Sequence, residues 1–402
     1  MTTQSKTKDR DVLLDVSRLV WRTWRRGFPT GIDRVCLAYL GHFAARSRAV
    51  VQRGGFQFIL SAKYSDRLFA ILNDRGPRRR TELLWLAARA ALSAVCSSPR
   101  PGMTYINVGH TGLNEPSLPR WIARHQLSAI YLVHDLIPLT HPEYCRPGEG
   151  WKHRARMENL LTSAAGVIGN SQATLNELAA FAAASKAPMP PHVAALISGY
   201  RESSPVHPRS LPEPYFVIVG TIEGRKNHLL LLQIWRRLVA DLGEKAPTLV
   251  ILGQRGWQAD SALAMLDNLA DLERHVVELG HCDDDQLACW MAGAKALLMP
   301  SFTEGFGLPI IEALQLSTPV IASDLPVYRE IAGDIPTYLD PCDGAAWEHA
   351  IREFMNDQPE RLHQLARLKD YHAPDWPTHF ATVENWLENL DRVRRSVETC
   401  AV

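Results

Sequence analysis

The sequence has few cysteines and no long uninterrupted run of apolar residues. Its seven cysteines are scattered, odd in number and never spaced as C-x2-C, which argues against a zinc site and against a disulfide framework. No run approaches the ~18 apolar residues of a membrane-spanning helix, and the polar first residues, MTTQSKTKDRD, lack the apolar centre of a signal peptide. We therefore expect a cytoplasmic protein whose thiols are reduced.

Strong biases of composition are also missing. The 402 residues are 46% hydrophobic and 22% charged, which excludes a disordered or collagen-like chain and predicts two globular domains. The net charge of +1 hides an asymmetry, because residues 1–200 hold 26 basic and 13 acidic side chains whereas residues 201–402 hold 18 and 30. A basic half indicates a phosphate-bearing ligand, an anionic membrane surface or a nucleic acid, or else an ordinary solvated arginine-rich face. Two groups of arginines contribute to the excess: Arg18, Arg22, Arg25 and Arg26, and then Arg78, Arg79 and Arg80.

Short β-branched segments alternate with longer segments of helical period along nearly the whole chain. We expect strands at 12–16, 56–60, 104–108, 129–133, 166–170 and 193–197, and then at 215–220, 248–253, 275–280, 295–300, 319–323 and 336–340. This alternation predicts parallel sheets with helices on both faces, and the nearly uniform apolar character of the strands agrees with it.

A proline-rich, weakly periodic interval, residues 198–215, divides the chain into halves of similar strand number. We expect a Rossmann-like N-terminal domain over residues 1–205, a Rossmann-like C-terminal domain over 206–376, and an amphipathic helix in 377–402 that packs back toward the first domain. The fold class is therefore α/β, with two doubly wound domains. Ligands of such sheets bind beyond the carboxyl ends of the strands, so the cleft between the two domains is the expected site.

The segment PSFTEGFGLPIIEAL, residues 300–314, carries the strongest functional signal. A strand is followed by a glycine-bearing turn, and a proline suits the first turn of the next helix. Four amides can face an anion or a sugar at this helix start, those of Gly305, Phe306, Gly307 and Leu308. Glu304 and Glu312 have the spacing to bind the vicinal hydroxyls of a sugar and of a ribose. The alternative is a structural turn in which Glu304 caps the helix and Glu312 is solvated.

On this E-x7-E segment the sequence resembles glycosyltransferase family 4, which comprises retaining enzymes of the GT-B fold with nucleotide-sugar donors. Further matching segments are GTIEGRKNH (220–228), LVILGQRGW (249–257) and SDLPVYREIAGD (323–334), and more thinly PTGIDRV (29–35), NVGHTGL (107–113) and HDLIPLTHPEY (134–144). The resemblance implies two GT-B domains that face a central cleft. It also implies that Glu304 holds the hydroxyls of the donor sugar and Glu312 the ribose.

Arg225 and Lys226 lie between an expected strand and the start of the next helix, where a diphosphate gains cationic contacts and backbone donors. The resemblance assigns this pair to the leaving nucleoside diphosphate. Many relatives carry an additional arginine where this sequence has Thr221. The alternative is a surface Arg–Lys pair, which the electrostatics of a helix start disfavours.

His134 and Asp135 end the strand at 129–133, and His110 ends the strand at 104–108. A lone histidine is usually structural, and Asp135 can simply hold the ring of His134. The strand-end position favours a role at the cleft. The resemblance places His134 near the reacting sugar carbon, where it donates to or polarises a sugar hydroxyl. We assign His110 and Asp135 to the acceptor side.

The first strand is followed by a loop that interleaves tryptophans and arginines and then by PTGIDRV. Gly31 allows a close approach of the backbone, and the resemblance places this loop near the donor phosphates and the acceptor. We assign Gly31 to the donor and Asp33 and Arg34 to the acceptor. The interleaved side chains could alternatively contact a lipid headgroup or pack beneath the loop.

Asp283, Asp284 and Asp285 could suggest a metal site, but they directly precede an expected helix, and helix capping explains them better. Arg225 and Lys226 can supply the positive charge that a metal ion would otherwise give. We therefore expect no metal and no cofactor.

The resemblance implies transfer of a sugar with retention of configuration. The branch resembled is rich in bacterial mannosyltransferases of surface-polysaccharide assembly, so GDP-mannose is the leading donor, and UDP- or dTDP-linked rhamnose, glucose or N-acetylglucosamine are the alternatives. The basic half suits a polyprenyl-diphosphate-linked acceptor at the cytoplasmic face of the inner membrane. Rival interpretations are a nucleotide-sugar epimerase, an inactive nucleotide-sugar-binding protein and a nucleic-acid binder. The last lacks an aromatic single-strand platform or a recognition helix, so no nucleic-acid partner is expected.

Overall fold

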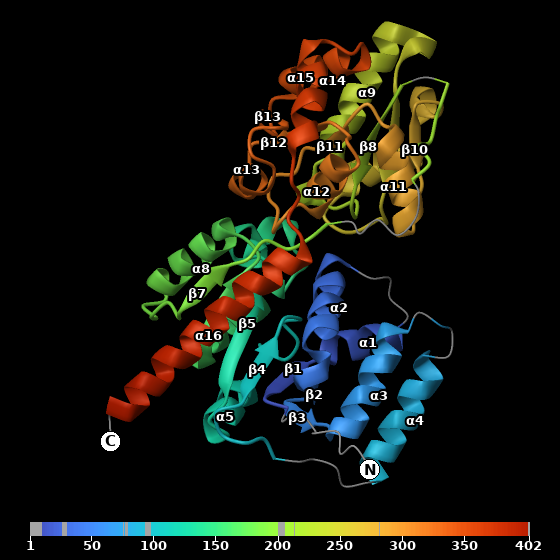
Figure 1. Cartoon of the computed structure of the whole chain (residues 1–402). Helices are drawn as coiled ribbons and strands as arrows, with labels where there is room; N and C mark the ends of the chain where they lie inside the picture. The colour runs from blue at the N-terminus through green and yellow to red at the C-terminus, as the bar shows by residue number, and fades with distance from the viewer. Residues whose placement is uncertain are drawn as a thin grey trace, which may run out of the picture.

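The computed structural model describes residues 10–25, 30–74, 76, 79–92, 98–199, 206–212, 214–280 and 282–400. The chain forms two α/β domains, one built on each of two sheets, and a long C-terminal helix that returns to the first domain (Figure 1). Within the described ranges, no helix combines the length and the apolar character that crossing a bilayer requires.

The N-terminal sheet has seven strands in the order β3-β2-β1-β4-β5-β6-β7. Their bounds are β1 Val12–Asp15, β2 Ser47–Arg53, β3 Phe56–Ile59, β4 Thr104–Asn107, β5 Ser128–Val133, β6 Ala164–Gly169 and β7 His192–Ala194. The central strands β1, β4 and β5 are buried almost throughout, which explains their uniformly apolar sequences.

Two expectations for this sheet were wrong. The strand β2 was missed, because the polar Arg48, Gln52 and Arg53 interrupt its apolar pattern. The strand β3 pairs antiparallel with β2, so the sheet is not wholly parallel. The two strands form a hairpin at Gly54 and Gly55, whose φ angles of 56° and 81° favour glycine.

The C-terminal sheet has six strands, all parallel, in the order β10-β9-β8-β11-β12-β13. They are β8 Tyr215–Val219, β9 Thr248–Leu252, β10 Val276–Glu278, β11 Leu297–Met299, β12 Val320–Ser323 and β13 Thr337–Leu339. Each lies within a segment expected from the sequence. The order reverses between β8 and β11, and ligands of doubly wound sheets bind at such a point.

Helices cover both sheets (Figure 1). In the N-terminal domain they are α1 Ser17–Arg25, α2 Gly31–Phe43, α3 Ala62–Asn73, α4 Arg79–Leu92, α5 Ser117–Arg124, α6 Ile137–Thr140, α7 Glu149–Ser163 and α8 Gln172–Ala184. In the C-terminal domain they are α9 His228–Leu242, α10 Asp260–Asp267, α11 Asp284–Gly293, α12 Leu308–Gln315, α13 Pro326–Ala332, α14 Gly344–Met355 and α15 Pro359–Arg367.

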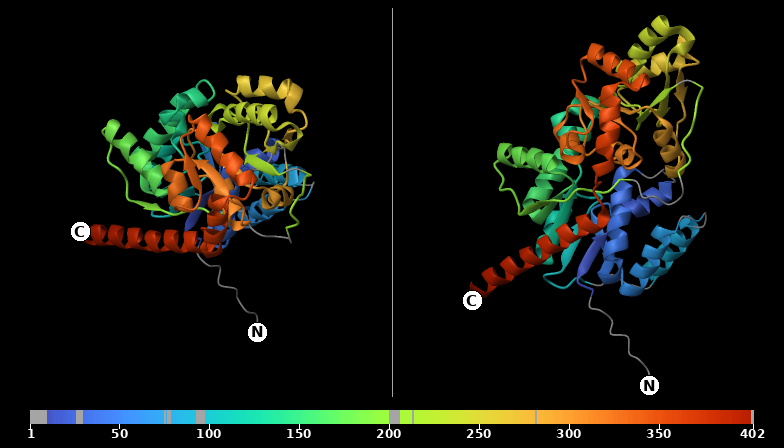
Figure 2. Two further views of the ribbon diagram at one scale, coloured as in Figure 1. Left: turned by 90° about the horizontal axis from the view of Figure 1, so that it is seen from above. Right: turned by 45° about the horizontal axis from the view of Figure 1, so that its top comes forward.

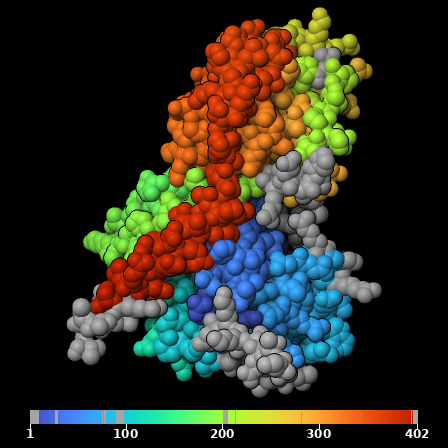
Figure 3. Space-filling view, in the orientation of Figure 1, coloured from blue at the N-terminus to red at the C-terminus, as the bar shows by residue number. Residues whose placement is uncertain are grey.

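The last helix, α16 (Trp376–Cys400), runs back along the N-terminal domain (Figures 1, 2 and 3). His379 Nε2 lies 2.9 Å from Tyr39 Oη, and Glu384 pairs with Arg46 at 2.7 Å. Farther along, Trp386 packs against Gly166, where a Cβ atom would lie 2.5 Å from the indole ring. One apolar cluster of buried residues includes members of both domains and of α16, so this helix fastens the end of the second domain to the first.

Candidate active site

The two domains meet through residues that follow the carboxyl ends of their strands. Asn170, directly after β6, donates from Nδ2 to His134 O at 2.8 Å and to Gly305 O of the C-terminal domain at 3.1 Å. A Cβ atom on Gly305 would lie 2.8 Å from Cβ of Asp135 and 2.9 Å from His134 O. Only glycine therefore allows this approach, which brings the β5, β6 and β11 strand ends together.

Glu304 lies in the turn after β11 and is held by two cations from the loop after β8. Its Oε2 lies 2.7 Å from Arg225 Nη1, and its Oε1 pairs with Lys226 Nζ and accepts from Ser301 Oγ at 3.0 Å. The side chains of Glu304 and Lys226 are each 7% exposed. Burial opposes ionisation of Glu304, but Arg225 and Lys226 outweigh it and lower its pKa to about 2.

The strand β8 ends in a loop whose backbone makes room for the lysine. Gly220 has a φ of 131°, and a Cβ atom there would lie 3.1 Å from Cε of Lys226. Lys226 and Arg225 then sit in the short 3-10 helix Gly224–Lys226, directly before α9. Burial lowers the pKa of Lys226, although Glu304 acts against this shift.

Arg225 is fixed by further partners that the sequence did not reveal. Its Nη2 pairs with Glu223 at 2.6 Å, and its Nη1 donates to Thr303 O at 3.2 Å. Glu223, Arg225, Lys226 and Glu304 thus form a cluster of two acids and two bases, which we call the charge cluster. The four side chains together carry a formal charge of zero. Arg225 and Lys226 therefore attract a diphosphate only when their ion pairs with the two carboxylates break.

The turn continues into α12 with the backbone geometry expected of a ligand-binding helix start. Gly307 caps the helix with a φ of 104°, and a Cβ atom there would lie 2.7 Å from the ring of buried Tyr328. The next residue, Leu308, contacts the N-terminal domain, because a Cβ atom on Gly31 would lie 3.1 Å from its Cδ1. Phe306 is buried. The donor-side residues Gly31 and Gly305 to Leu308 therefore come together across the domain boundary.

Glu312, one turn farther along α12, binds a residue of the other domain. Arg34 of α2 donates from Nη1 to Glu312 Oε1 at 2.6 Å, and its Nη2 pairs with Asp284 at the start of α11. The Glu312 side chain is 4% exposed, so the alternative of a solvated residue was wrong. Burial raises the pKa of Glu312 and Arg34 opposes that rise. The sequence assigned Arg34 to an acceptor, but here it joins two carboxylates of the C-terminal domain.

The aspartates at 283–285 act at the start of α11. Asp283 Oδ1 accepts from Gln286 N at 2.8 Å in a capping box, which confirms the capping interpretation. Among the described residues, no group of three or more His, Cys, Asp or Glu side chains is arranged to hold a metal ion.

Asp33 fixes the start of α2. It accepts from Arg18 Nε at 2.7 Å and from Thr30 N at 2.7 Å, and it pairs with Arg22 at 3.1 Å. Asp33 is 2% exposed, so the carboxylate assigned to the acceptor is largely engaged inside the domain. Arg26, from the same arginine group, lies outside the described residues.

Three histidines line the end of β5. The rings of His110 and His134 are 5.0 Å apart, and those of His110 and His153 are 6.1 Å apart. Each Nε2 faces a backbone oxygen, that of Leu132, Val108 and Asp135 respectively, and a carbonyl can only accept. Each Nε2 therefore carries the hydrogen, and in the neutral ring Nδ1 is left as an acceptor.

Burial keeps these rings neutral. It lowers the pKa of His134 to about 4 and that of His110 well below its usual range. The backbone of Val108, not Asp135, holds the His134 ring, while Asp135 accepts from Ile137 N at 3.2 Å. His134 can thus accept from a sugar hydroxyl through Nδ1, whereas its one N–H is already used. The φ of His110 is 57°, a strained value for histidine.

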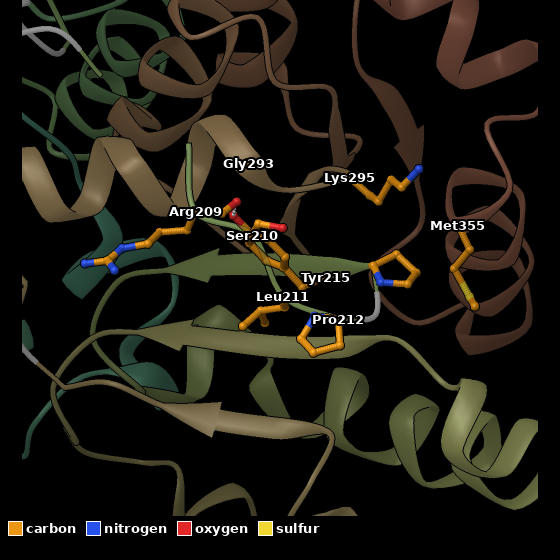
Figure 4. Close-up of a pocket in the computed structure, with 9 residues that line it drawn as sticks. Arg209, Ser210, Leu211, Pro212, Tyr215, Gly293, Lys295 and Met355 are labelled. Atoms are coloured by element: carbon orange, nitrogen blue, oxygen red, sulfur yellow. Dashed lines mark hydrogen bonds between the residues drawn. The ribbon is translucent and has the colours of Figure 1, made fainter. Parts of the chain in front are cut away.

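An open cavity of about 320 Å³ lies away from the candidate site, at the amino ends of the strands β8 and β11 (Figure 4). Tyr215, which begins β8, and Lys295, which precedes β11, contribute to its lining together with Arg209. The charge cluster follows the other ends of these strands, so this cavity does not belong to the site.

The C-terminal domain was compared with models of known protein families. Residues 200–369 match the family model of the glycosyl transferases group 1. The match spans most of the C-terminal domain, which we call the group 1 domain. The matched range contains the whole charge cluster and Glu312, so the group 1 domain supplies every C-terminal residue of the candidate site.

Proteins of similar sequence include bacterial mannosyltransferases. The serotype-specific mannosyltransferase WbdA of Escherichia coli is 28% identical over 278 residues, which is 65% of this chain and 33% of WbdA. The O-antigen chain mannosyltransferase B of Escherichia coli is 35% identical over 153 residues, which is 38% of this chain and 40% of the relative. The chain thus spans about a third of the length of WbdA.

Solved structures give the fold of the whole chain. Alr3699/HepE of Anabaena, in complex with UDP and glucose, has a TM-score of 0.64 at 15% identity and covers 94% of this chain and 99% of its own. Sucrose-phosphate synthase of Thermosynechococcus elongatus has a TM-score of 0.58 at 16% identity. The likeness covers 97% of this chain and 99% of the synthase chain. The group 1 domain and the N-terminal domain together form the GT-B fold, as expected from the resemblance.

Proposed function

We propose that this protein is a retaining hexosyltransferase that moves a sugar, mannose from GDP-mannose in the leading case, onto a lipid-linked oligosaccharide during assembly of a bacterial surface polysaccharide. The observation that carries the proposal is the placement of Glu304. This carboxylate is buried between Arg225 and Lys226, directly before the glycine-capped start of α12. The group proposed to bind the sugar and the groups proposed to bind the diphosphate are therefore immediate neighbours.

Binding of the donor exchanges partners inside the charge cluster. The diphosphate takes the cations of Arg225 and Lys226, and the hydroxyls of the sugar replace those cations on Glu304. The amides of Gly305 to Leu308 add backbone donors at the positive end of α12. Before the donor binds, Arg225 and Lys226 hold the pKa of Glu304 at about 2, so the carboxylate is ionised when the sugar hydroxyls reach it.

In the transfer step, the bond between the anomeric carbon and the diphosphate oxygen breaks, and a bond to the acceptor oxygen forms on the same face. The acceptor proton passes to the departing phosphate oxygen, so charge and atoms balance without a protein nucleophile. Arg225 and Lys226 stabilise the growing negative charge, and we propose that no metal ion or cofactor is required. His134 accepts from a sugar hydroxyl through Nδ1 and thereby orients the ring.

The mannose donor is supported by the relatives, whose printed names are those of O-antigen and serotype-specific mannosyltransferases. A UDP-sugar is the second candidate, because the Anabaena protein of the same fold was solved with UDP and glucose. Glu312 suits the ribose of either nucleotide, so this carboxylate does not discriminate between them.

For the acceptor, we propose a polyprenyl-diphosphate-linked glycan reached from the cytoplasmic face of the inner membrane. The support is the basic N-terminal half and the O-antigen names of the relatives. We propose that His110 and Asp135 of the N-terminal domain contribute to the acceptor side.

Thermal-shift measurements against GDP-, UDP-, dTDP- and ADP-sugars test the donor. A specific donor at 100 times its Kd adds about 2.7 kcal/mol to the unfolding free energy, whereas the others leave the melting temperature unchanged. We expect GDP-mannose to stabilise the protein and Glu304→Gln to abolish transfer. Donor binding without release of nucleoside diphosphate in the presence of any acceptor would instead identify an inactive nucleotide-sugar-binding protein.

A further inference from the structure

Large apolar side chains are exposed along one flank of the N-terminal domain, where α1 and α4 lie next to α3 (Figure 1). Trp85 is 64% exposed, Leu84 is 48% exposed, and Trp24 at the end of α1 is 38% exposed. Three such side chains on neighbouring helices are not the scattered single apolar residues of an ordinary surface.

Buried and exposed apolar side chains occur in the same turn of α4. The exposed ones therefore do not result from local unfolding of the helix. Leu83 and Leu86 are buried at 6% and 4% exposure and anchor the helix to the domain. Leu84 and Trp85 lie on the opposite side of the same turn, so α4 is apolar on both faces. Within the described chain, the outer face therefore leaves large parts of Leu84 and Trp85 exposed.

Positive charge borders the outer face. Arg80 precedes Leu84 by one turn and Arg89 follows Trp85 by one turn, so the arginines flank the apolar pair along the helix. The guanidinium of Arg80 also lies 4.9 Å from the ring centre of Trp24, which joins the two helices into one surface. The sequence of α4 contains three arginines and one acidic residue, Glu82.

We propose that this surface docks the protein on an anionic phospholipid membrane. We call it the α4 surface and define it by Trp24, Arg80, Leu84, Trp85 and Arg89. Tryptophan and leucine insert at the boundary between headgroups and acyl chains, while the flanking arginines contact lipid phosphates. A negatively charged bilayer offers phosphates to the arginines and an apolar interior to Leu84 and the two tryptophans, so it complements both features of this surface.

This proposal places the membrane contact away from Arg18 and Arg22, which lie in helix α1 and not in the loop expected from the sequence. Arg18 and Arg22 pair with Asp33 inside the domain, so they serve the fold of the α2 start. The α4 surface borders the same region through Trp24, because α1 ends shortly before Thr30, the cap of α2. This inference deepens the proposed function and rests on it for the lipid-linked acceptor, which would enter beside the docked surface.

Vesicle co-sedimentation of the full chain tests the α4 surface directly. We expect binding to vesicles of phosphatidylglycerol and phosphatidylcholine, weak binding to phosphatidylcholine alone, and loss of binding at high salt. Each arginine near an anionic surface contributes about fivefold to partitioning, so R80E/R89E lowers it by at least about 25-fold. L84S/W85S lowers it by at least about tenfold.

The chain offers a matched control for each variant. Trp151 on α7 is 66% exposed, so W151S removes an equally exposed tryptophan from another surface. R236E/R274E reverses the same number of exposed charges on the C-terminal domain. Both controls should bind vesicles like the wild type, and circular dichroism with thermal melting should show all variants folded.

Several outcomes would overturn the inference: equal binding by wild type and both α4 variants, loss of binding in W151S instead, or a dimer in sedimentation velocity that L84S/W85S dissociates. Transfer to a soluble acceptor separates this inference from the proposed function. If L84S/W85S loses vesicle binding but keeps that transfer, both stand. If the wild type binds vesicles as expected but transfers no sugar, the α4 surface stands and the proposed function fails.

Discussion

Arg34 and Glu312 form a 2.6 Å ion pair that joins the N-terminal domain to the group 1 glycosyl transferase domain. The Glu312 carboxylate is almost completely buried, whereas the Arg34 side chain is 35% exposed. Because Arg34 also pairs with Asp284, it draws α11 and α12 of the second domain toward α2 of the first. The residue proposed to hold the donor ribose is thus positioned from the opposite domain.

Replacement of Arg34 by alanine is expected to weaken donor binding. Glu312 would lose its charged partner, and burial would then raise its pKa further, so a larger fraction would be protonated and unable to accept from both ribose hydroxyls. We expect KM for the donor to rise about tenfold, with kcat changed less, and the rise to grow as the pH falls. Arg34→Lys should restore part of the affinity. An unchanged KM at every pH would contradict this role.

Glu304→Gln is expected to separate binding of the product from transfer. The substitution removes one negative charge from the charge cluster, so Lys226 loses its carboxylate partner and Arg225 keeps only Glu223. GDP should therefore bind about tenfold more tightly. Transfer should fall by about 100-fold or more, because the amide cannot replace a carboxylate on the sugar hydroxyls. Calorimetry with GDP and a transfer assay measure the two effects. Glu353→Gln, on the surface of α14, is the control and should alter neither.

The same glutamate makes stability depend on pH. Its pKa of about 2 in the folded protein lies below the ordinary 4.5, so its contribution is present above pH 4.5 and is lost as the pH falls toward 2. The shift corresponds to about 3 kcal/mol of unfolding free energy. Urea unfolding between pH 5 and pH 3 should show a steeper loss of stability in the wild type than in Glu304→Gln. Parallel curves would mean that the ion pairs do not survive in solution.

We expect that ionisation of His134 does not affect the pH dependence of the transfer rate near neutrality. Its pKa of about 4 keeps the ring neutral above pH 5, and protonation below that value would remove the Nδ1 acceptor. The rate should therefore decline only as the pH approaches 4. His134→Gln can keep a donor on Val108 O, but its amide oxygen does not occupy the position of Nδ1, so it should lose transfer with little change in melting temperature. An apparent pKa near 6.5 that disappears in this variant would contradict the assignment.

Gly305→Ala is expected to push the domains apart at the site. The new Cβ atom would meet His134 O at 2.9 Å, and backbone cannot move aside as a side chain can. We expect kcat/KM to fall at least tenfold. Gly41→Ala is the matched control, because nothing lies within 4 Å of a Cβ atom there, and in the interior of α2 it should stabilise the protein slightly. Equal activity of the two variants would show that the domains do not need this close approach.

Much of the fold could be predicted from local patterns in the sequence. The strands β8 to β13 were predicted because each is short, apolar and followed by a turn, and α16 because its apolar positions recur at helical spacing. The strand β2 was missed because arginines interrupt it, and the antiparallel pairing of β3 was missed because pairing direction is not encoded in a strand's own periodicity. The sequence analysis missed Asn170. Its position as a polar residue directly after a strand is the signal that could have identified it.

The sequence by itself determined which chemical groups are present and where along the chain they lie: the E-x7-E spacing, the Arg225–Lys226 pair and the strand-end histidines. Such features follow from local order, since a strand, a glycine turn and a helix start need only a few neighbouring residues. Only the tertiary structure decided which groups meet, such as Arg34 with Glu312 or Asn170 with Gly305. Those partners are 278 and 135 residues apart, and no local pattern records a contact that packing of two separate domains creates.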